Sequence, residues 1–530
     1  MSTSILAEVN NEMAMVEVGA RVVCRNEHGT VRFKGQVLQT KGLWLGVEWD
    51  NPERGLHDGS HEGKQYFKCT HPTGGSFVRL NKVNFGINFL LALEEQYSSN
   101  VQLDNDSLPV WKGHKKPVIL VGMEKVLQKQ SQFEKLLRVS FPEHYVSSAD
   151  PEGEIRATCP NIKELCLTKQ LLSTWDDVAK ITIELSHLHH LNLSENRLRV
   201  PDNPSVLANA FSNLRLLILN KCAISWPQIL QCASMWPVLE ELNIHCNGIS
   251  TLSRPEGVLL TLKRLMLEDN NLTSNDDLLH LSHLPCLEVL NLDNNRLTDI
   301  MFPDVVAGQK TSMFKQLKQL IISNNLISNW KSVDELEKLP CLTELKITFN
   351  PVIEKEQDSG TAQQMVVARV GGLQTLNFMP VSKKERSQAE WVYVRRFGVE
   401  WQKAGGREEK GPSEEFLQLH PRYQQLIEKF GAPEESELQP STHIMKVDLL
   451  PLNILCPDHP KRKPIKKTFP SAMSLHKVKS FLAHLLKIKG CELNLSYMTQ
   501  EGSREYHMPN DVNPLHFYAI APGDSLLVRW

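Results

Sequence analysis

The stretch LEVLNLDNNRL (287–297) carries the spacing that decides the fold of this chain. Apolar residues occupy its first, fourth, sixth and eleventh positions, and an asparagine occupies the ninth. Clear copies of this spacing are LHHLNLSENRL (188–198), LEELNIHCNGI (239–249), LKRLMLEDNNL (262–272), LKQLIISNNLI (317–327) and LTELKITFNPV (342–352). Weaker copies are LLRVSFPEHYV (136–146), IKELCLTKQLL (162–172), LRLLILNKCAI (214–224) and LQTLNF (373–378). Such self-similarity has to be recognised before any single element is assigned, because it determines the whole architecture.

The second apolar position of each copy serves as an anchor that fixes the register of the repeat. The anchors are Val139, Leu165, Leu191, Leu217, Leu242, Leu265, Leu290, Leu320, Leu345 and Leu376, and neighbouring anchors are 23 to 31 residues apart. This pattern resembles the leucine-rich repeat, in which each unit supplies a short strand, a turn and a helical return. The copies then stack into an α/β solenoid whose leucines face inward. Unrelated amphipathic helices would not keep this register.

Five residues after the anchor, most copies carry a side chain that can bond to the backbone of the turn. These residues are Asn196, Asn247, Asn270, Asn295, Asn325 and Asn350, with Cys222 in the same position once. An amide both donates and accepts, so the asparagines are expected to form a ladder that satisfies buried backbone groups. A solenoid also needs polar caps. Residues 123–137 and 373–397 are expected to form them, so the solenoid should span residues 123–397.

Side chains alternate along a strand, so the residues one before, one after and three after each anchor should form an outward surface, called the strand face below. In such a solenoid this is the concave face. Its expected charged residues include Glu241, Arg264, Glu268, Asp293, Glu344 and Lys346, with apolar residues between them. A surface of mixed charge with apolar patches suits a protein partner, and its acidic excess would repel a phosphate backbone.

Residues 14–90 read as short strands interrupted by glycines, which is typical of a small all-β barrel. The run GLHDG (55–59), followed by SHEGKQYF (60–67) and GGSFVR (74–79), resembles the CAP-Gly family. The resemblance covers the whole module. It implies binding of acidic C-terminal tails that end in Glu-Glu-Tyr or Glu-Glu-Phe, as on α-tubulin. Backbone N–H groups freed by glycine would capture the terminal carboxylate beside an aromatic groove.

Matching the family motif assigns roles to individual residues of this module. The implied tail-binding residues are Phe33 and Trp44 in the groove, Gly55, Leu56, His57, Asp58 and Gly59 in the signature loop, and Arg79 near the tail. The family usually has lysine and asparagine where this chain has Leu56 and His57. Losing a charge-assisted hydrogen bond costs roughly 1.5–3 kcal/mol, about ten- to a hundredfold in affinity. We therefore expect weakened tail binding, partly compensated by Lys64 or Arg79. Trp49 and Phe67 suit the groove or the core equally.

Residues 443–530 follow a polar linker and alternate strand-like segments with one helical pattern, SLHKVKSFLAHLLKI (474–488). This order of elements resembles the ubiquitin-like α+β fold, the β-grasp. The basic run KRKPIKK (461–467) suits either a nuclear signal or a solvated strand edge. Between the three domains, residues 91–122 are expected to form a linker and residues 398–442 a helical segment followed by a linker.

The composition of the chain excludes several classes of protein. Of 530 residues, 41% are hydrophobic, and 59 basic residues nearly balance 61 acidic ones. The sum hides segregation, because residues 14–90 and 443–530 are basic whereas residues 91–442 are acidic. No run approaches the ~18 apolar residues of a membrane span, and the N-terminus lacks the basic start of a signal peptide. Eleven scattered cysteines without a C-x-x-C pair argue against disulfides and a zinc site, and favour a reduced, cytoplasmic protein.

No catalytic fingerprint occurs in the sequence: it contains no nucleophile elbow, H-E-x-x-H, P-loop or dinucleotide motif. The densest histidine cluster is His187, His189 and His190, on an expected repeat strand without cysteine or carboxylate at ligand spacing. We therefore expect no enzyme activity, no cofactor and no metal.

The order CAP-Gly, leucine-rich repeats, ubiquitin-like domain resembles the tubulin-folding cofactor E family. That resemblance implies binding of the tail and body of α-tubulin, and assembly and dissociation of the α/β-tubulin heterodimer. It also implies work with tubulin cofactors B and D in the cytoplasm, in association with the cytoskeleton. An alternative is a ubiquitin-pathway adaptor that delivers tubulin to the proteasome. A spliceosomal-type repeat protein that binds RNA disagrees with the acidic solenoid.

Overall fold

The chain forms two compact units in a computed structural model, residues 1–432 and 433–530. The structure describes residues 16–97, 132–142, 144–356, 359–408, 410–434, 449–460, 462–488, 493–499, 505–508, 511, 513–518 and 520–530. The first unit holds the all-β module and the solenoid, and the second is the ubiquitin-like domain.

One sheet of eleven strands forms the solenoid, in the order β19-β18-β17-β16-β15-β14-β13-β12-β11-β10-β8. Its strands are β8 (Arg138–Ser140), β10 (Glu164–Cys166), β11 (His190–Asn192), β12 (Leu216–Ile218), β13 (Glu241–Asn243), β14 (Arg264–Met266), β15 (Val289–Asn291), β16 (Gln319–Ile321), β17 (Glu344–Lys346), β18 (Thr375–Leu376) and β19 (Met379–Pro380). All ten predicted anchors pair with one another across neighbouring parallel strands, from Val139 to Leu376, which confirms the predicted register.

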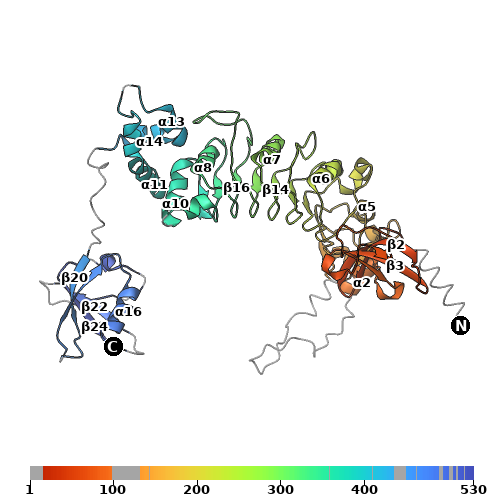
Figure 1. Ribbon diagram of the computed structural model, residues 1–530, viewed down its shortest axis with the longest axis horizontal. Helices are drawn as coiled ribbons and strands as arrows, with labels where there is room; N and C mark the ends of the chain where they lie inside the picture. Colours follow the sequence, from red (N-terminus) through yellow and green to blue (C-terminus); the bar gives the residue numbers. More distant parts are fainter. Residues whose placement is uncertain are drawn as a thin grey trace. The chain divides into compact units, whose positions relative to one another are not determined.

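Short helical returns lie along one side of these strands, as α6, α7 and α8 show in Figure 1. The α-helices are α4 (Glu154–Thr158), α5 (Trp175–Thr182), α6 (Trp226–Cys232), α7 (Asn275–His280), α8 (Trp330–Leu336) and α9 (Pro351–Glu354). Their starts follow capping rules: Thr174 and Asp177 bond reciprocally at the start of α5, and the Asn329 side chain accepts from the backbone N–H of Ser332 at α8. Strand leucines and helix side chains share one continuous core.

The predicted amide ladder is present. Asn270, for example, accepts from the backbone N–H groups of Asn247 and Ile249 and donates to the carbonyls of Leu267 and Ile244. Cys222 holds the equivalent position with a weaker Sγ contact, 3.3 Å from the carbonyl oxygen of a neighbouring repeat. Sequence reasoning missed Gln170, which occupies this position one repeat before Asn196. Its longer amide reaches the backbone of Phe141 at 2.8 Å and Val146 at 2.7 Å.

The N-terminal end of the solenoid differs from the prediction. Residues 91–97, expected in a linker, belong to helix α2 (Phe89–Tyr97), because Phe89, Ala92 and Leu93 form an apolar stripe that enters the solenoid core. The Tyr97 hydroxyl bonds both the N–H and the carbonyl of Ser140, which satisfies part of the edge strand β8. Of the cap expected at 123–137, residues 123–131 lie outside the described residues, and Phe133–Lys135 forms a single 3-10 turn.

The C-terminal end is covered by helices. They are α10 (Ser359–Arg369), α11 (Lys383–Arg396), α12 (Gly398–Lys403), α13 (Glu414–Leu419) and α14 (Tyr423–Phe430), and their buried residues form a separate aromatic cluster. We call this the cap cluster: Met365, Ala368, Tyr393, Val394, Trp401, Phe416, Tyr423 and Leu426. His420 is buried against it, with Nδ1 2.7 Å from the Tyr393 hydroxyl.

His420 makes the stability of the cap cluster depend on pH. Burial, with the nearby Arg369 charge, lowers the pKa of His420 from 6.5 to about 4. The fold therefore favours the neutral ring, so its contribution is full above pH 6.5 and is lost as pH falls from 6.5 towards 4. The shift corresponds to about 3 kcal/mol. Unfolding in urea across this range should show a steeper loss of stability than in His420→Gln, and equal slopes would contradict the expectation.

The N-terminal module is an antiparallel sheet in the order β1-β2-β3-β6. Its strands are β1 (Arg21–Cys24), β2 (Glu27–Gln36), β3 (Leu43–Trp49) and β6 (Gly75–Val78), with a small hairpin of β4 (Ser60–His61) and β5 (Lys64–Gln65). The core contains Val22, Val31, Leu45, Val47 and Trp49.

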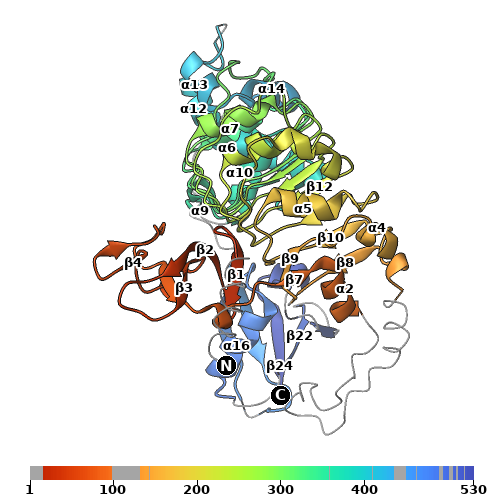
Figure 2. The ribbon, with the colours of Figure 1, turned by 90° about the vertical axis from the view of Figure 1, so that its right-hand side faces the viewer.

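A parallel pairing joins this module to the solenoid. Strand β7 (Ile87–Asn88) pairs with β9 (Val146–Ser148), and Figure 2 shows the two side by side. An ion pair of 3.2 Å between Asp50 and Arg197 adds a second contact. The chain thus continues from the module into the solenoid with direct contacts between them.

The second unit has the β-grasp arrangement. A sheet in the order β21-β20-β24-β22-β23 packs against helix α16, with β20 and β24 parallel at its centre. The elements are β20 (Leu449–Leu455), β21 (Ile465–Pro470), α16 (Leu475–Leu485), β22 (Asn494–Met498), β23 (Glu505–His507) and β24 (Ser525–Arg529). The basic run lies partly on the edge strand β21, where exposed Lys466 and Lys467 discourage pairing with another edge.

Candidate functional site

The signature loop requires glycine at two positions. Gly59 has φ of +99°, and a Cβ there would lie 2.0 Å from the carbonyl oxygen of Phe67. A Cβ at Gly55 would lie 2.0 Å from the carbonyl oxygen of Thr73. Neither position has space for a side chain, so only glycine lets the loop lie this close to the neighbouring backbone.

Backbone hydrogen bonds hold the loop against β6. The N–H of Leu56 donates to the carbonyl of Gly75 at 2.7 Å, and the N–H of Gly75 donates to the carbonyl of His57 at 2.7 Å. This pairing turns the Leu56 side chain outward, where it is 80% exposed. An apolar side chain so exposed on a rigid loop is available to a ligand.

His57 is oriented by the loop itself. Its Nδ1 accepts from the backbone N–H of Gly59 at 3.0 Å, which places the proton of the neutral ring on Nε2. Burial lowers the pKa of His57, so the neutral ring with an Nε2–H donor is favoured. Asp58 instead serves the loop: its carboxylate accepts from the N–H and hydroxyl of Ser60, which lower its pKa.

Aromatic rings gather beside this loop and form what we call the ring groove: Phe33, His57, His61, Tyr66, Phe67 and Phe77. Phe77 lies at its centre, with ring centroids 4.9 Å from His57, 5.5 Å from Tyr66 and 6.2 Å from Phe33. The contacts of Phe77 with Phe33 and Tyr66 are edge-to-face and that with His57 is tilted, and such contacts stabilise the cluster while the rings stay half-buried. The ammonium of Lys64 lies 5.1 Å from the Tyr66 ring centre and adds positive charge.

Trp44 and Arg79 form a second pair. The contacts described for them are with each other and with residues 40–43, and not with the ring groove. The Arg79 guanidinium stacks on Trp44 at 3.6 Å and donates to the carbonyls of Leu43 at 2.8 Å and Lys41 at 2.5 Å. Trp44 donates from Nε1 to the Thr40 hydroxyl at 2.8 Å. The Arg79 guanidinium is therefore already bonded to the backbone of the 41–43 turn. Lys64 is the better placed cation to compensate for the lysine that Leu56 replaces.

The two residues left open by the sequence differ in role. Trp49 lies in the module core. Phe67 is buried, but it also touches the ring groove, with its ring centroid 5.5 Å from that of Phe77. Sequence reasoning missed Tyr66, Phe77 and His61 as groove residues. A signal was present, because all three lie in the quoted strings SHEGKQYF and GGSFVR.

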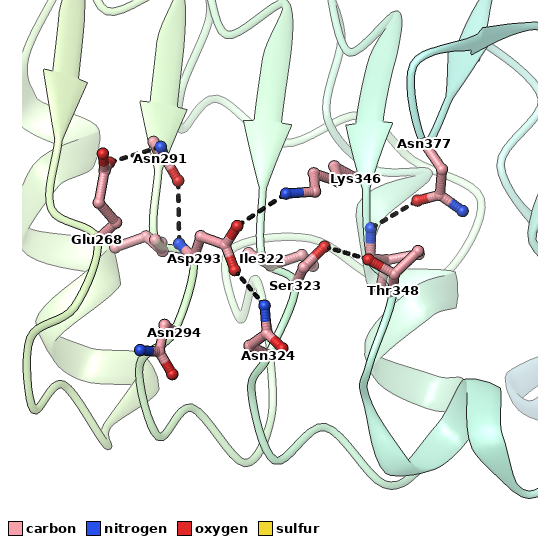
Figure 3. Close-up of polar contacts among 12 residues, drawn as sticks. Glu268, Asn291, Asp293, Asn294, Ile322, Ser323, Asn324, Lys346, Thr348 and Asn377 are labelled. Carbon is pink, nitrogen blue, oxygen red and sulfur yellow. Dashed lines mark hydrogen bonds and ion pairs between the residues drawn. The ribbon is translucent and has the colours of Figure 1, made fainter. Parts of the chain in front are cut away.

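On the strand face, the predicted charged residues lie in pairs. Arg264 contacts Glu241 at 3.1 Å, and the Lys346 ammonium contacts Asp293 at 2.8 Å. Figure 3 shows Asp293 also accepting from Asn324. Burial raises the pKa of Asp293, but the bonds from Lys346 and Asn324 outweigh it and the pKa is lowered.

The remaining two acids of the face bind neighbouring amides. Glu268 accepts from Asn291 at 2.5 Å, and burial raises its pKa (Figure 3). Glu344 accepts from Gln319 at 2.9 Å. The face therefore carries few unpaired charges, and its recognition of a partner would depend strongly on apolar contact.

Comparison with known proteins identifies the family to which the chain belongs. A family model for the CAP-Gly domain matches residues 18–83, and one for the leucine-rich repeat matches residues 235–404. The tubulin-specific chaperone E of Danio rerio is 46% identical over 97% of this chain and 99% of its own length. The chain belongs to the tubulin-specific chaperone E family. The Homo sapiens member is 44% identical over 100% of both chains.

A solved structure from the tubulin-specific chaperone E family is similar to part of this chain. The solution structure of the C-terminal ubiquitin-like domain of mouse tubulin-specific chaperone E is 44% identical, with a TM-score of 0.15, and covers 16% of this chain and 86% of that one. None of the helices that the structure describes combines the length and apolarity that a bilayer crossing needs.

Proposed function

We propose that this chain takes part in assembly and dissociation of the α/β-tubulin heterodimer by binding α-tubulin, rather than by catalysis. One observation carries the proposal: an aromatic groove lies beside a glycine-built loop in a member of the tubulin-specific chaperone E family. The groove receives the acidic C-terminal tail, and the strand face contacts the folded body. The protein works with tubulin cofactors B and D, in the cytoplasm and in association with the cytoskeleton.

The ring groove offers complementary chemistry to such a tail. The Nε2–H of His57 is suited to a carboxylate, and the half-buried rings of Phe33, Tyr66 and Phe77 to a terminal aromatic side chain. Lys64 attracts the preceding acidic residues. Trp44 and Arg79, which stack on each other, would contact a more distant part of the tail.

Leu56 sets the strength of this contact. Leu56→Lys places a cation on an exposed loop beside the bound tail, and a charge-assisted hydrogen bond is worth roughly 1.5–3 kcal/mol. We expect the affinity for a Glu-Glu-Tyr peptide to rise by about ten- to a hundredfold. Fluorescence titration of the full chain measures it. Val18→Lys, which adds the same charge at another exposed apolar residue of the module, should change little. Unchanged affinity in Leu56→Lys would contradict the assignment.

Contact with the folded body is assigned to an apolar patch at the C-terminal end of the strand face. Phe349, Phe378 and Met379 are 65%, 65% and 69% exposed, and the Lys346 ammonium lies 5.4 Å from the Phe378 ring centre. Large apolar side chains at this exposure are typical of an interaction site. Two tethered contacts raise each other's effective concentration, so a weak tail site still contributes.

The heterodimer itself provides the test. Adding the purified chain to α/β-tubulin should lower the dimer fraction in analytical ultracentrifugation. Proteolytic removal of the α-tubulin tail and the double variant Phe349→Asp/Phe378→Asp should each weaken the effect. Val306→Asp, at an exposed apolar residue elsewhere, should leave it unchanged. A dimer fraction that does not respond to the chain, or a response insensitive to both changes, would overturn the proposal.

A further inference from the structure

The turn after each repeat strand creates two rows of side chains that run across the repeats. The residue four positions after the anchor has a left-handed backbone in successive repeats, with φ of 56° at Lys221, 55° at Cys246, 55° at Asp269 and 53° at Asn294. A left-handed residue interrupts the alternation of a strand, so side chains three and four positions after the anchor can lie together. Parallel strands about 4.8 Å apart bring equivalent positions of adjacent repeats to contact distance.

Between the repeats anchored at Leu242 and Leu265, these rows assemble metal-ligating groups. The row at position three pairs His245 with Glu268, whose Nδ1 and Oε1 atoms are 3.7 Å apart. The row at position four pairs Cys246 with Asp269. The donor atoms of His245, Cys246 and Asp269 all lie within 4.8 Å of one another. Among the described residues this is the one such group, and it does not include His187, His189 or His190.

We propose that His245, Cys246 and Asp269, with Glu268 as fourth donor, form a zinc-binding site on the solenoid. One nitrogen, one sulfur and carboxylate oxygens suit Zn²⁺, which accepts all three donor types in tetrahedral geometry. Calcium and magnesium take oxygen donors alone, and thiolate disfavours them. This proposal departs from the expectation of no metal, because the solenoid brings together donors from two repeats that no C-x-x-C motif would reveal.

The surroundings of the donors fit a metal site. Glu268 accepts from Asn291 at 2.5 Å and Asp269 accepts from Asn294 at 2.5 Å, so both carboxylates are oriented by side chains of the next repeat. Figure 3 shows the first of these contacts. The adjacent pairs Asn220–Lys221 and Asp293–Asn294 lack sulfur and imidazole, so the donor set is confined to one place in the solenoid. The Lys221 ammonium, whose charge would oppose that of a metal ion, interacts electrostatically with Cys246.

Binding would transfer a proton to solvent. The Cys246 S–H bond breaks as the sulfur–zinc bond forms, and the metal takes no electron in the process. Because the sulfur binds zinc as a thiolate, protons compete with the metal and the affinity for zinc should increase with pH. A bound ion would link the two repeats and stabilise the folded chain by mass action.

Titration of the full, reduced chain with Zn²⁺ against a chromophoric chelator tests the site. We expect one equivalent to bind, with affinity lowered roughly tenfold to a hundredfold in Cys246→Ser and in Asp269→Asn. Cys286→Ser, at an exposed cysteine outside the cluster, should bind as the unaltered chain does. Co²⁺ should give a thiolate-to-metal absorption band that Cys246→Ser abolishes. Circular dichroism of each metal-free variant verifies that it is folded.

Three results would overturn the proposal. They are the absence of saturable zinc binding by the folded chain, equal affinity in Cys246→Ser and the unaltered chain, and loss of binding only in His189→Gln. The last would place the ion at the histidine cluster of the β11 repeat instead.

Discussion

Gly59→Ala should weaken capture of a Glu-Glu-Tyr peptide by the full chain by at least roughly thirtyfold. The substitution has two costs at once. Its φ of +99° is strained for any residue with a Cβ, and the new atom would lie 2.0 Å from the carbonyl oxygen of Phe67. Backbone strain costs about 1–3 kcal/mol and overpacking about 1–3 kcal/mol. The loop can relieve this cost of at least about 2 kcal/mol only by leaving its place against Phe67, and restoring that place for the tail corresponds to roughly thirtyfold weaker binding.

Gly63→Ala separates these two effects. Gly63 also has a left-handed φ, +77°, but a Cβ there would have no atom within 4 Å. It should therefore carry the strain without the clash, and retain most of the affinity. Peptide titration by fluorescence anisotropy measures both variants, with thermal unfolding of each to establish that the module is folded. Affinity in Gly59→Ala within threefold of the unaltered chain would refute the role of this loop in binding.

The sequence predicted the structure best where the same buried contacts recur in every repeat. Each strand of the solenoid buries the same leucine and satisfies the same backbone groups, so one motif such as 287–297 predicted ten anchors in register. The amide ladder followed for the same reason, since a buried turn needs one donor and one acceptor per repeat. Gln170 escaped because a longer amide can serve the same backbone groups from the same position.

The ends of the solenoid were not predictable in this way, because the sequence of each end occurs only once in the chain and has no copies to compare. Helix α2 has only Phe89, Ala92 and Leu93 as its apolar stripe, which is too short to mark a cap without knowing what it covers. At the site, the motif placed the signature loop, but the sequence could not show that Arg79 would bond the backbone of the 41–43 turn. Partners so distant in sequence become visible only in three dimensions.

The zinc-binding site could not be predicted for the same reason, because its donors come from two different repeats. His245 and Cys246 are separated from Asp269 by more than twenty residues, and only the repeat length of the solenoid brings them together. Reading the sequence by columns of the repeat, rather than along the chain, would have found this group. The same reading distinguishes Phe349, an aromatic residue in the column that holds Lys221, Cys246, Asp269 and Asn294 in other repeats.

The ion pair between Arg369 and Asp334 joins the solenoid to its C-terminal helices, and removing one partner should have a large effect. Both side chains are buried, and one guanidinium nitrogen lies 2.7 Å and 2.6 Å from the two carboxylate oxygens. The guanidinium also lies 5.2 Å from the ring centre of Tyr393 in the cap cluster. Arg369→Met leaves the Asp334 carboxylate buried without its partner, which costs about 3–5 kcal/mol. Urea unfolding of the full chain should show this loss.

Two further variants separate the charge from the packing. In Arg369→Met/Asp334→Leu no charge is left unpaired, so much of the stability should return, because apolar replacement of a buried pair is often neutral. Arg396→Met removes a cation that is 3.1 Å from Glu356 but 41% exposed on its side chain, and should cost at most about 1 kcal/mol. Equal losses in Arg369→Met and Arg396→Met would show that the buried pair does not hold the cap. A double variant no more stable than Arg369→Met would assign the effect to the lost stacking on Tyr393 instead.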